Sequence, residues 1–396
     1  MNVPKLRFPE FSGEWEEKKL DELSIINPKP DDLPEVFSYI DLESVKNGAL
    51  LQEKKIKKDD APSRAQRLLK ENDILFQTVR PYQRNNYFFV SKTPTVASTG
   101  YAQFRVNKYN YPSFLYQYLY TNNFVRNVLD RCSGTSFPAI STNDLLEITL
   151  HIPSYHEQQK IADFLSNVDS IITAETKILN TLQKKKKALM QKLFTRQLRF
   201  KSDDGTDFPA WEEKKLGEIS SSPKYGLNAS GIDYDGEHKY LRITDIDEVT
   251  HTFSPEEITT PSEFSDDYLL EENDIVFART GASTGKTYLY NPNDGDLYFA
   301  GFLIKFHIKD ANARFVFYQT CTHEYEKWVH VMSTRSGQPG INSEEYSTLK
   351  IKLPCIEEQQ KIANCLSSMD SLIQNQQKVV TTWQQRKKAL LQQMFI

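Results

Sequence analysis

Two long segments of the chain carry apolar residues at alternating intervals of four and three positions. The first runs from Ile161 to Leu193 and the second from Ile362 to Met394, and neither contains an internal proline or glycine. This heptad spacing places the apolar residues on one narrow stripe of an α-helix, which is typical of a helix that packs along another helix. The predicted seam residues are Ile161, Leu165, Val168, Ile172, Leu179, Leu182, Ile362, Leu366, Met369, Ile373, Val380 and Trp383.

Both stripes are interrupted by polar residues at corresponding places. Glu175 and Lys186 interrupt the first stripe, and Gln376 and Lys387 interrupt the second. Polar residues in an apolar seam usually set register or orientation rather than add stability. We therefore expect the two helices to pair with each other as an antiparallel coiled coil. The alternative is that each helix packs only on its own domain.

The helices belong to a duplication that covers the whole chain. The block Trp15–Ser24 matches Trp211–Ser220 at eight of ten positions, and EQQKIA at Glu157–Ala162 returns unchanged at residues 358–363. The block at 71–76 also returns at 272–277. A unit of about 200 residues used twice predicts an α+β fold, with two mixed α/β domains in a tandem pseudo-symmetric repeat, separated by the two long helices. The expected segments are 1–153, 154–198, 199–354 and 355–396.

Short β-rich runs predict the strands of each globular part. In the first copy they are 73–79, 87–90 and 102–106, and in the second copy 274–278, 286–290 and 302–308. Residues 113–129 are rich in tyrosine and leucine and predict one helix.

Charge is balanced over the whole chain but not locally. The 396 residues hold 49 lysines and arginines against 53 acids, for a net charge of −4, which excludes a polycationic protein. Residues 74–129, however, contain no acid at all, while arginine, lysine, tyrosine and amide side chains alternate there. Such a run suits a surface that lies against phosphates. The second copy has glycine-rich, hydroxyl-rich loops at 279–287 and 333–341, whose backbone amides could approach phosphate oxygens.

Signatures of catalysis, metal binding and membrane insertion are missing. HExxH, GxSxG and GxGxxG do not occur, and the seven histidines have no metal-ligand spacing. The segment 281–287 has three residues between its glycines, where a P-loop needs four. The first residues lack the apolar core of a signal peptide, and no apolar stretch is long enough to span a membrane. Four cysteines without a CxxC pair are typical of reduced thiols in the cytoplasm.

The chain resembles the specificity (S) subunit of type I restriction–modification systems. The resemblance covers nearly all residues and rests on the Trp15 and Trp211 blocks, the prolines Pro153 and Pro354 before the helices, the EQQKIA segments and the KKAL helix ends. It implies two target-recognition domains that each read one part of a bipartite site in double-stranded DNA. The helices would act as a spacer and dock partners.

The same resemblance implies partner subunits and no catalytic residue or cofactor in this chain. Two modification subunits would use S-adenosylmethionine to methylate adenine, and two restriction subunits would use ATP and Mg²⁺ for translocation and cleavage. The family's recognition domains are variable, so base contacts cannot be transferred by motif. From charge we expect DNA faces at residues 74–143 and 275–343. The candidate contacts are Arg80, Gln83, Arg84, Arg105, Arg279, Lys286, Arg335 and Gln338. The rival interpretation is a duplicated coiled-coil scaffold or adaptor without DNA binding.

Overall fold

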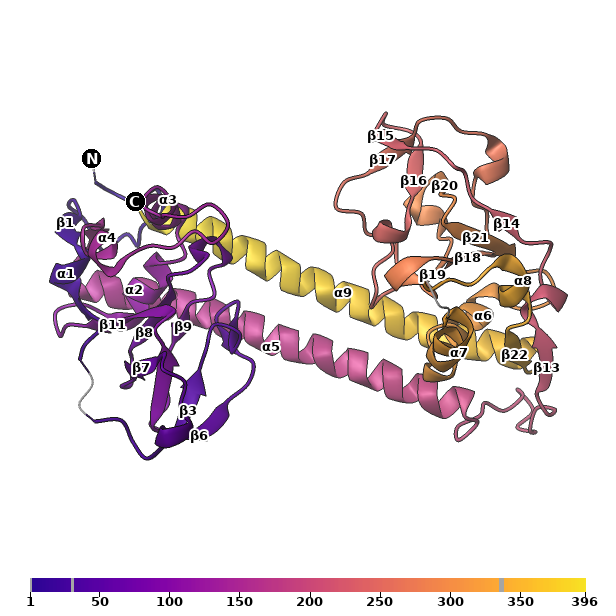
Figure 1. The fold of residues 1–396 in the computed structure, drawn as a ribbon, viewed down its shortest axis with the longest axis horizontal. Helices are drawn as coiled ribbons and strands as arrows, with labels where there is room; N and C mark the ends of the chain where they lie inside the picture. Colours follow the sequence, from indigo (N-terminus) through magenta and orange to yellow (C-terminus); the bar gives the residue numbers. More distant parts are fainter. Residues whose placement is uncertain (1, 30–31, 335–337) are drawn as a thin grey trace. The chain divides into compact units, whose positions relative to one another are not determined.

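The chain divides into two compact units in a computed structural model that describes residues 2–29, 32–334 and 338–396. The first unit comprises Met1–Ile178 with Gln376–Ile396, and the second comprises Leu179–Asn375. Each unit contains a globular α/β part and portions of both long helices (Figure 1). The predicted division into four segments stays a prediction; the boundaries of the compact units fall inside the two long helices.

The two long helices that the heptad stripe predicts are present. They are α5 (Tyr155–Phe194) and α9 (Ile356–Met394). In the first unit, Asp169 of α5 binds Lys387 of α9, and Glu175 binds Gln376. Residue numbers therefore rise along α5 as they fall along α9, so the helices pair in antiparallel fashion in this unit.

The first unit contains two four-stranded sheets. One has the order β2-β11-β8-β9 and is antiparallel, whereas the other has the order β6-β3-β10-β7 and includes the parallel pair β3–β10. The strands of these sheets are β2 (Ser24–Ile26), β3 (Val36–Ile40), β6 (Lys54–Lys57), β7 (Ala65–Leu68), β8 (Ile74–Gln77), β9 (Tyr87–Phe88), β10 (Thr95–Ser98) and β11 (Tyr101–Val106). Two-stranded pairs are formed by β1 (Glu16–Lys19) with β12 (Thr149–Ile152) and by β4 (Val45–Lys46) with β5 (Ala49–Leu50).

The second unit repeats part of this plan, with separate two-stranded sheets β16–β20 and β15–β17 where the first unit has one four-stranded sheet. Its antiparallel sheet β14-β21-β18-β19 corresponds to β2-β11-β8-β9, and its parallel pair β16–β20 corresponds to β3–β10. The strands are β13 (Glu212–Lys215), β14 (Lys224–Tyr225), β15 (Gly231–Asp233), β16 (Lys239–Leu241), β17 (Thr259–Pro261), β18 (Asp274–Ala278), β19 (Thr287–Leu289), β20 (Leu297–Phe299), β21 (Leu303–His307) and β22 (Lys350–Leu353). The duplication read from the sequence is thus confirmed for the antiparallel sheet and for the parallel strand pair.

One predicted element is wrong. The single helix expected at 113–129 is two helices, because Thr121 leaves the helical conformation and its side chain accepts a hydrogen bond from the backbone N–H of Phe124. Threonine is a favoured N-cap, so it starts a new helix here. The second unit breaks its helix at Thr322 in the same way. The shorter helices are α1 (Leu20–Leu23), α2 (Pro112–Tyr118), α3 (Asn122–Leu129), α4 (Thr142–Leu146), α6 (Ala313–Gln319), α7 (His323–Ser333) and α8 (Ser343–Ser347).

Each unit's core takes residues from the start of one long helix and the end of the other. In the first unit, Leu165 of α5 and Phe395, which follows α9, belong to one buried cluster with the globular part. In the second unit, Leu366 of α9 and Leu193 of α5 do the same. The aromatic ring of Phe395 lies 5.2 Å from that of Phe114 between centroids. Both helices are therefore required to complete both cores.

Candidate nucleic-acid interface and helix seam

In the first unit, three of the predicted contact residues lie on one loop. Strand β8 is followed by a short 3-10 helix (Pro81–Gln83), which Arg80 and Arg84 flank in the left-handed backbone conformation, each with φ of 54°. The loop is held by the segment before α4, because the backbone N–H of Arg80 donates to the carbonyl of Pro138 at 2.7 Å. Arg80, Gln83 and Arg84 are therefore brought together at the end of the central strand.

Two of these side chains remain available to a ligand. The Arg80 guanidinium lies over the ring of Phe137, 4.3 Å from its centroid, and that ring is 62% exposed. The Nε of Arg80 is shielded from solvent and has no hydrogen-bond partner among the described residues. The Oε1 of Gln83 accepts a hydrogen bond from Gln77 Nε2 at 2.9 Å, which leaves the exposed Gln83 amide nitrogen free to donate. Such groups suit hydrogen bonds to base edges or phosphates.

The other two arginines predicted in this unit are already satisfied. Arg84 donates to the carbonyl of Tyr120 at 3.0 Å and to Asn122 Oδ1 at 2.9 Å, and burial lowers its pKa. Arg105 donates two hydrogen bonds, of 2.9 and 2.7 Å, to the buried carboxylate of Asp73. These contacts give both residues a structural role, and a DNA contact by either of them stays a prediction from the sequence.

The second unit places Arg279 at the equivalent loop. Arg279 follows β18, its Nε donates to the carbonyl of Gly301 at 3.0 Å, and its guanidinium lies 5.1 Å from the ring centroid of Tyr225. Exposed Gln338 lies on the neighbouring segment, which is held because Gly281 N–H donates to the carbonyl of Pro339 at 2.9 Å. This loop pair is therefore built like that of the first unit.

The last two residues predicted to contact DNA in the second unit are Lys286 and Arg335. Lys286 forms an ion pair with Glu248 at 2.9 Å, so its charge is already balanced within the unit. Arg335 lies outside the described residues.

The two arginine–aromatic stacks occupy different positions of the repeat. The backbone N–H of Ile140 donates to Thr78, and that of Ile341 donates to Arg279, so Arg279 corresponds to Thr78. By the same alignment Arg80 corresponds to Gly281. Each unit therefore has an arginine that lies over an aromatic ring on the same pair of loops, but the two arginines stand at different positions of the repeat.

A group of acidic and histidine side chains has the composition of a metal site. Glu271, Asp274 and His307 place ligand atoms within 4.8 Å of one another, the one such group found in the described residues. The Lys305 ammonium, however, lies 3.1 Å from Asp274 Oδ2 and neutralises it. Lys305 and His307 occupy the places that Gln103 and Arg105 take around Asp73, and the group is therefore a structural ion-pair cluster.

The helix seam pairs its polar residues. Every predicted seam residue is buried or half-buried. Glu175 accepts a hydrogen bond from Gln376 Nε2 at 2.6 Å in the first unit, where Lys387 lies 2.6 Å from Asp169. In the second unit Lys186 lies 2.5 Å from Asp370, the repeat equivalent of Asp169. The polar interruptions therefore meet complementary groups on the facing helix.

The first turns of each long helix also pack on the globular part of their unit. Ile161 and Leu165 belong to the core of the first unit, and Ile362 and Leu366 to that of the second. Each of these clusters also contains residues from the end of the facing helix, so the helices share these cores as well.

Sequence reasoning missed a clamp that fixes each long helix to its domain. The buried carboxylate of Glu157 accepts hydrogen bonds from Arg7 at 2.7 and 2.8 Å and from Trp15 Nε1 at 3.3 Å. Glu358 accepts from Arg199 and from Trp211 Nε1 in the same way. The repeated tryptophans and glutamates indicated that these residues matter. Because each pair lies far apart in sequence, the sequence did not show that they are in contact.

Comparisons with known proteins agree with this architecture. The family described as "Type I restriction modification DNA specificity domain" matches residues 12–184 and again 210–382. The MjaVIII type I restriction enzyme specificity subunit of Methanocaldococcus jannaschii is 26% identical over 98% of this chain and 92% of its own length. The HindI specificity subunit of Haemophilus influenzae is 31% identical over 34% of this chain and 30% of its own length.

Solved structures share the fold. A type I restriction–modification S subunit from M. genitalium has a TM-score of 0.60 and 15% identity, with 100% of this chain and 99% of that chain covered. A chain from a study of complex assembly in the type I system has a TM-score of 0.56 and 20% identity, with 96% and 97% covered. In the described part of the chain, no helix combines the length and apolar character that crossing a bilayer requires.

Proposed function

Because the chain belongs to the family of type I restriction modification DNA specificity proteins, we propose that it is the DNA-recognition subunit of such a complex, in which each unit reads one part of a bipartite DNA site. The subunit itself is non-catalytic. The comparisons lend no support to the rival interpretation of a scaffold without DNA binding.

One observation carries the assignment of the reading surface. Each unit presents an arginine stacked on an aromatic ring, Arg80 on Phe137 and Arg279 on Tyr225, at the same pair of loops. Stacking holds a guanidinium plane in place, and its edge then offers the paired donors that suit guanine or a phosphate. Because the two arginines stand at different repeat positions, we infer that the two units read different half-sites.

We propose the partners and cofactors that the resemblance to this family implies. Two modification subunits would dock on the long helices and methylate adenine with S-adenosylmethionine, and two restriction subunits would supply ATP- and Mg²⁺-dependent translocation and cleavage. We place the complex in the cytoplasm, where its DNA substrate would be. The helices α5 and α9 would set the length of the gap between the half-sites.

The experiment compares Arg80→Ala and Arg279→Ala in the assembled complex. Methylome sequencing of a host that carries each variant reports which bases remain required for modification. We expect Arg80→Ala to relax the requirement at one half-site and Arg279→Ala at the other, with about 1–3 kcal/mol lost in binding for a base contact. An unchanged recognition site in both variants would contradict the assignment of these loops.

A further inference from the structure

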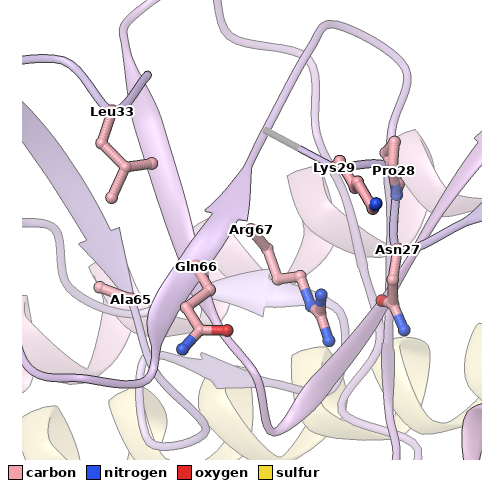
Figure 2. A pocket seen from close by; sticks show the side chains of 7 residues that line it. All are labelled: Asn27, Pro28, Lys29, Leu33, Ala65, Gln66 and Arg67. Carbon is pink, nitrogen blue, oxygen red and sulfur yellow. The ribbon is translucent and has the colours of Figure 1, made fainter. Parts of the chain in front are cut away.

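We propose that a pocket in the first unit binds a phosphate group of the DNA backbone, with Arg67 as its principal contact. The pocket has a volume of about 360 Å³ and lies between strand β7 and the segment that follows β2. Figure 2 shows its lining, with the Arg67 side chain extending toward Asn27. The inference rests on the proposed DNA-recognition function and adds a contact that the acid-free run of the sequence does not include.

Arg67 is a half-buried cation without a partner. Its Nε is shielded from solvent, and its guanidinium has no hydrogen bond or ion pair among the described residues. Arg7, Arg105 and Arg199 are each paired with a buried carboxylate instead. Burial lowers the pKa of Arg67, which shows that its surroundings disfavour the charge. An unpaired buried charge costs folding free energy, and an anionic ligand would offset that cost.

The other groups that line the pocket favour an anion. Lys29 is exposed and contributes a second cation, and none of the described lining residues is acidic. The side chain of Asn27 is already committed, because its Nδ2 donates to Thr142 Oγ1 and its Oδ1 accepts from the backbone N–H of Gln103. The Asn27 bonds fix the wall of the pocket, and Arg67 and Lys29 are left to bind the ligand.

The pocket is close to the proposed reading loop of the same unit. Pro138 accepts the hydrogen bond from Arg80, and Thr142 accepts the one from Asn27. Pro138 and Thr142 are four positions apart in the chain, so their Cα atoms lie at most roughly 14 Å apart. The same short segment therefore anchors both the Arg80 loop and the Asn27 wall of the pocket.

The test replaces Arg67 by methionine, which keeps the aliphatic volume and removes the charge. We expect Arg67→Met to raise the melting temperature of the free chain, because an unpaired buried charge is lost. We also expect DNA binding by the complex to weaken for all sequences, with the salt slope reduced by about 0.9, or roughly eightfold in affinity at 0.1 M relative to 1 M salt. A lower melting temperature with an unchanged slope would overturn the proposal.

Arg64→Met is the matched control, since Arg64 is an exposed arginine directly before the same strand. We expect it to leave both the melting temperature and the salt slope nearly unchanged. An equal loss of slope in Arg64→Met and Arg67→Met would mean that general charge at this edge binds DNA, and would overturn the pocket as a specific site.

A duplex with single methylphosphonate linkages distinguishes the sources of the phosphate. We expect neutralisation of one linkage to weaken binding by the wild-type complex but not by Arg67→Met. Stabilisation by inorganic phosphate alone, with no linkage sensitive to Arg67, would instead identify a free anion and overturn the DNA contact. A failure of the proposed DNA-recognition function would have a different signature. It would appear as an unchanged recognition site in the Arg80→Ala and Arg279→Ala variants, whatever the result for Arg67→Met.

Discussion

At the scale of single residues, the clamp at the start of each long helix explains why one motif is repeated without change. Glu157 and Glu358 are buried carboxylates, and each accepts hydrogen bonds from an arginine and a tryptophan that lie far away in sequence. The side chains of Gln158 and Gln359 each donate to the carbonyl of the proline before the helix. A side chain with several fixed partners leaves little room for substitution, which accounts for the identity of the two EQQ segments.

Replacing Glu157 by glutamine is expected to destabilise the first unit by about 2–3 kcal/mol, because half-buried Arg7 would lose its charged hydrogen-bond partner. Urea unfolding followed by tryptophan fluorescence measures the effect, since Trp15 is part of the clamp. Glu10→Gln is the control, because Glu10 forms an exposed ion pair with Lys160 and its loss should leave the stability nearly unchanged. Equal effects of the two substitutions would contradict a special role for the clamp.

His251 is expected to make the second unit sensitive to acid. Burial lowers its pKa, and its Nδ1 lies 3.1 Å from the carbonyl of Thr287, so the neutral ring fits the site. The folded state therefore binds its proton less readily than the unfolded state, whose histidine titrates near about 6.5. Stability from this group is present above that pH and is lost as the pH falls.

The measurement compares melting temperatures at pH 7.5 and pH 5.5 for the wild type and His251→Gln. We expect the wild type to lose more than the variant over this interval, because glutamine cannot take up the proton. The same loss in both proteins would show that His251 does not contribute to acid sensitivity.

At the scale of elements, the polar residues of the helix seam act as matched pairs. Asp169 with Lys387 and Lys186 with Asp370 are images of one another under the repeat, so these ion pairs would also suit two identical helices. Glu175 with Gln376 differs, because a carboxylate here meets an amide. This pair therefore distinguishes the two helices from each other, which the ion pairs cannot do.

Gln376→Glu is expected to destabilise the helix pair by about 2 kcal/mol, because a hydrogen bond to a charged group is replaced by two facing carboxylates. Glu175→Gln in the same chain should restore most of the loss, since the donor and acceptor are then exchanged. Chemical denaturation of both single variants and the double variant gives the coupling free energy. If the two losses of unfolding free energy simply added in the double variant, the two residues would not act as a pair.

At the scale of the whole molecule, the two helices connect the units and also complete their cores. Phe395 packs on Phe114 in the first unit, and Phe194 packs on Phe315 in the second. A helix anchored in a core at each end has a fixed number of residues between its anchors. The length of this shared segment is therefore suited to set the gap between two half-sites.

Inserting one heptad into both α5 and α9, near Glu175 and Gln376, is expected to lengthen the gap in the recognised site and leave the half-sites unchanged. A heptad adds about 10.5 Å to a helix and preserves the register of the seam. Methylome sequencing reports the gap and the half-sites together. Altered half-sites with a constant gap would refute the spacer role of the helices.

The sequence by itself determined the duplication, the two long helices, the main strands and the family. These features depend on local periodicity and on repeated residues, both of which are visible along the chain. The helix expected at 113–129 failed because a threonine cap outweighed the apolar pattern. For the proposed reading surface, composition selected a basic segment but could not separate Arg80, whose Nε has no partner among the described residues, from Arg105, which is paired with Asp73.

Only the tertiary structure decided which charges are free. Arg105 and Arg84 have partners that come from other strands and helices, whereas Arg67 is half-buried and has none among the described residues. The partners lie tens of residues away, and whether two such groups meet depends on how the sheets and helices pack. Charge counted along the chain finds basic segments, but the packing determines which of the cations can bind a ligand.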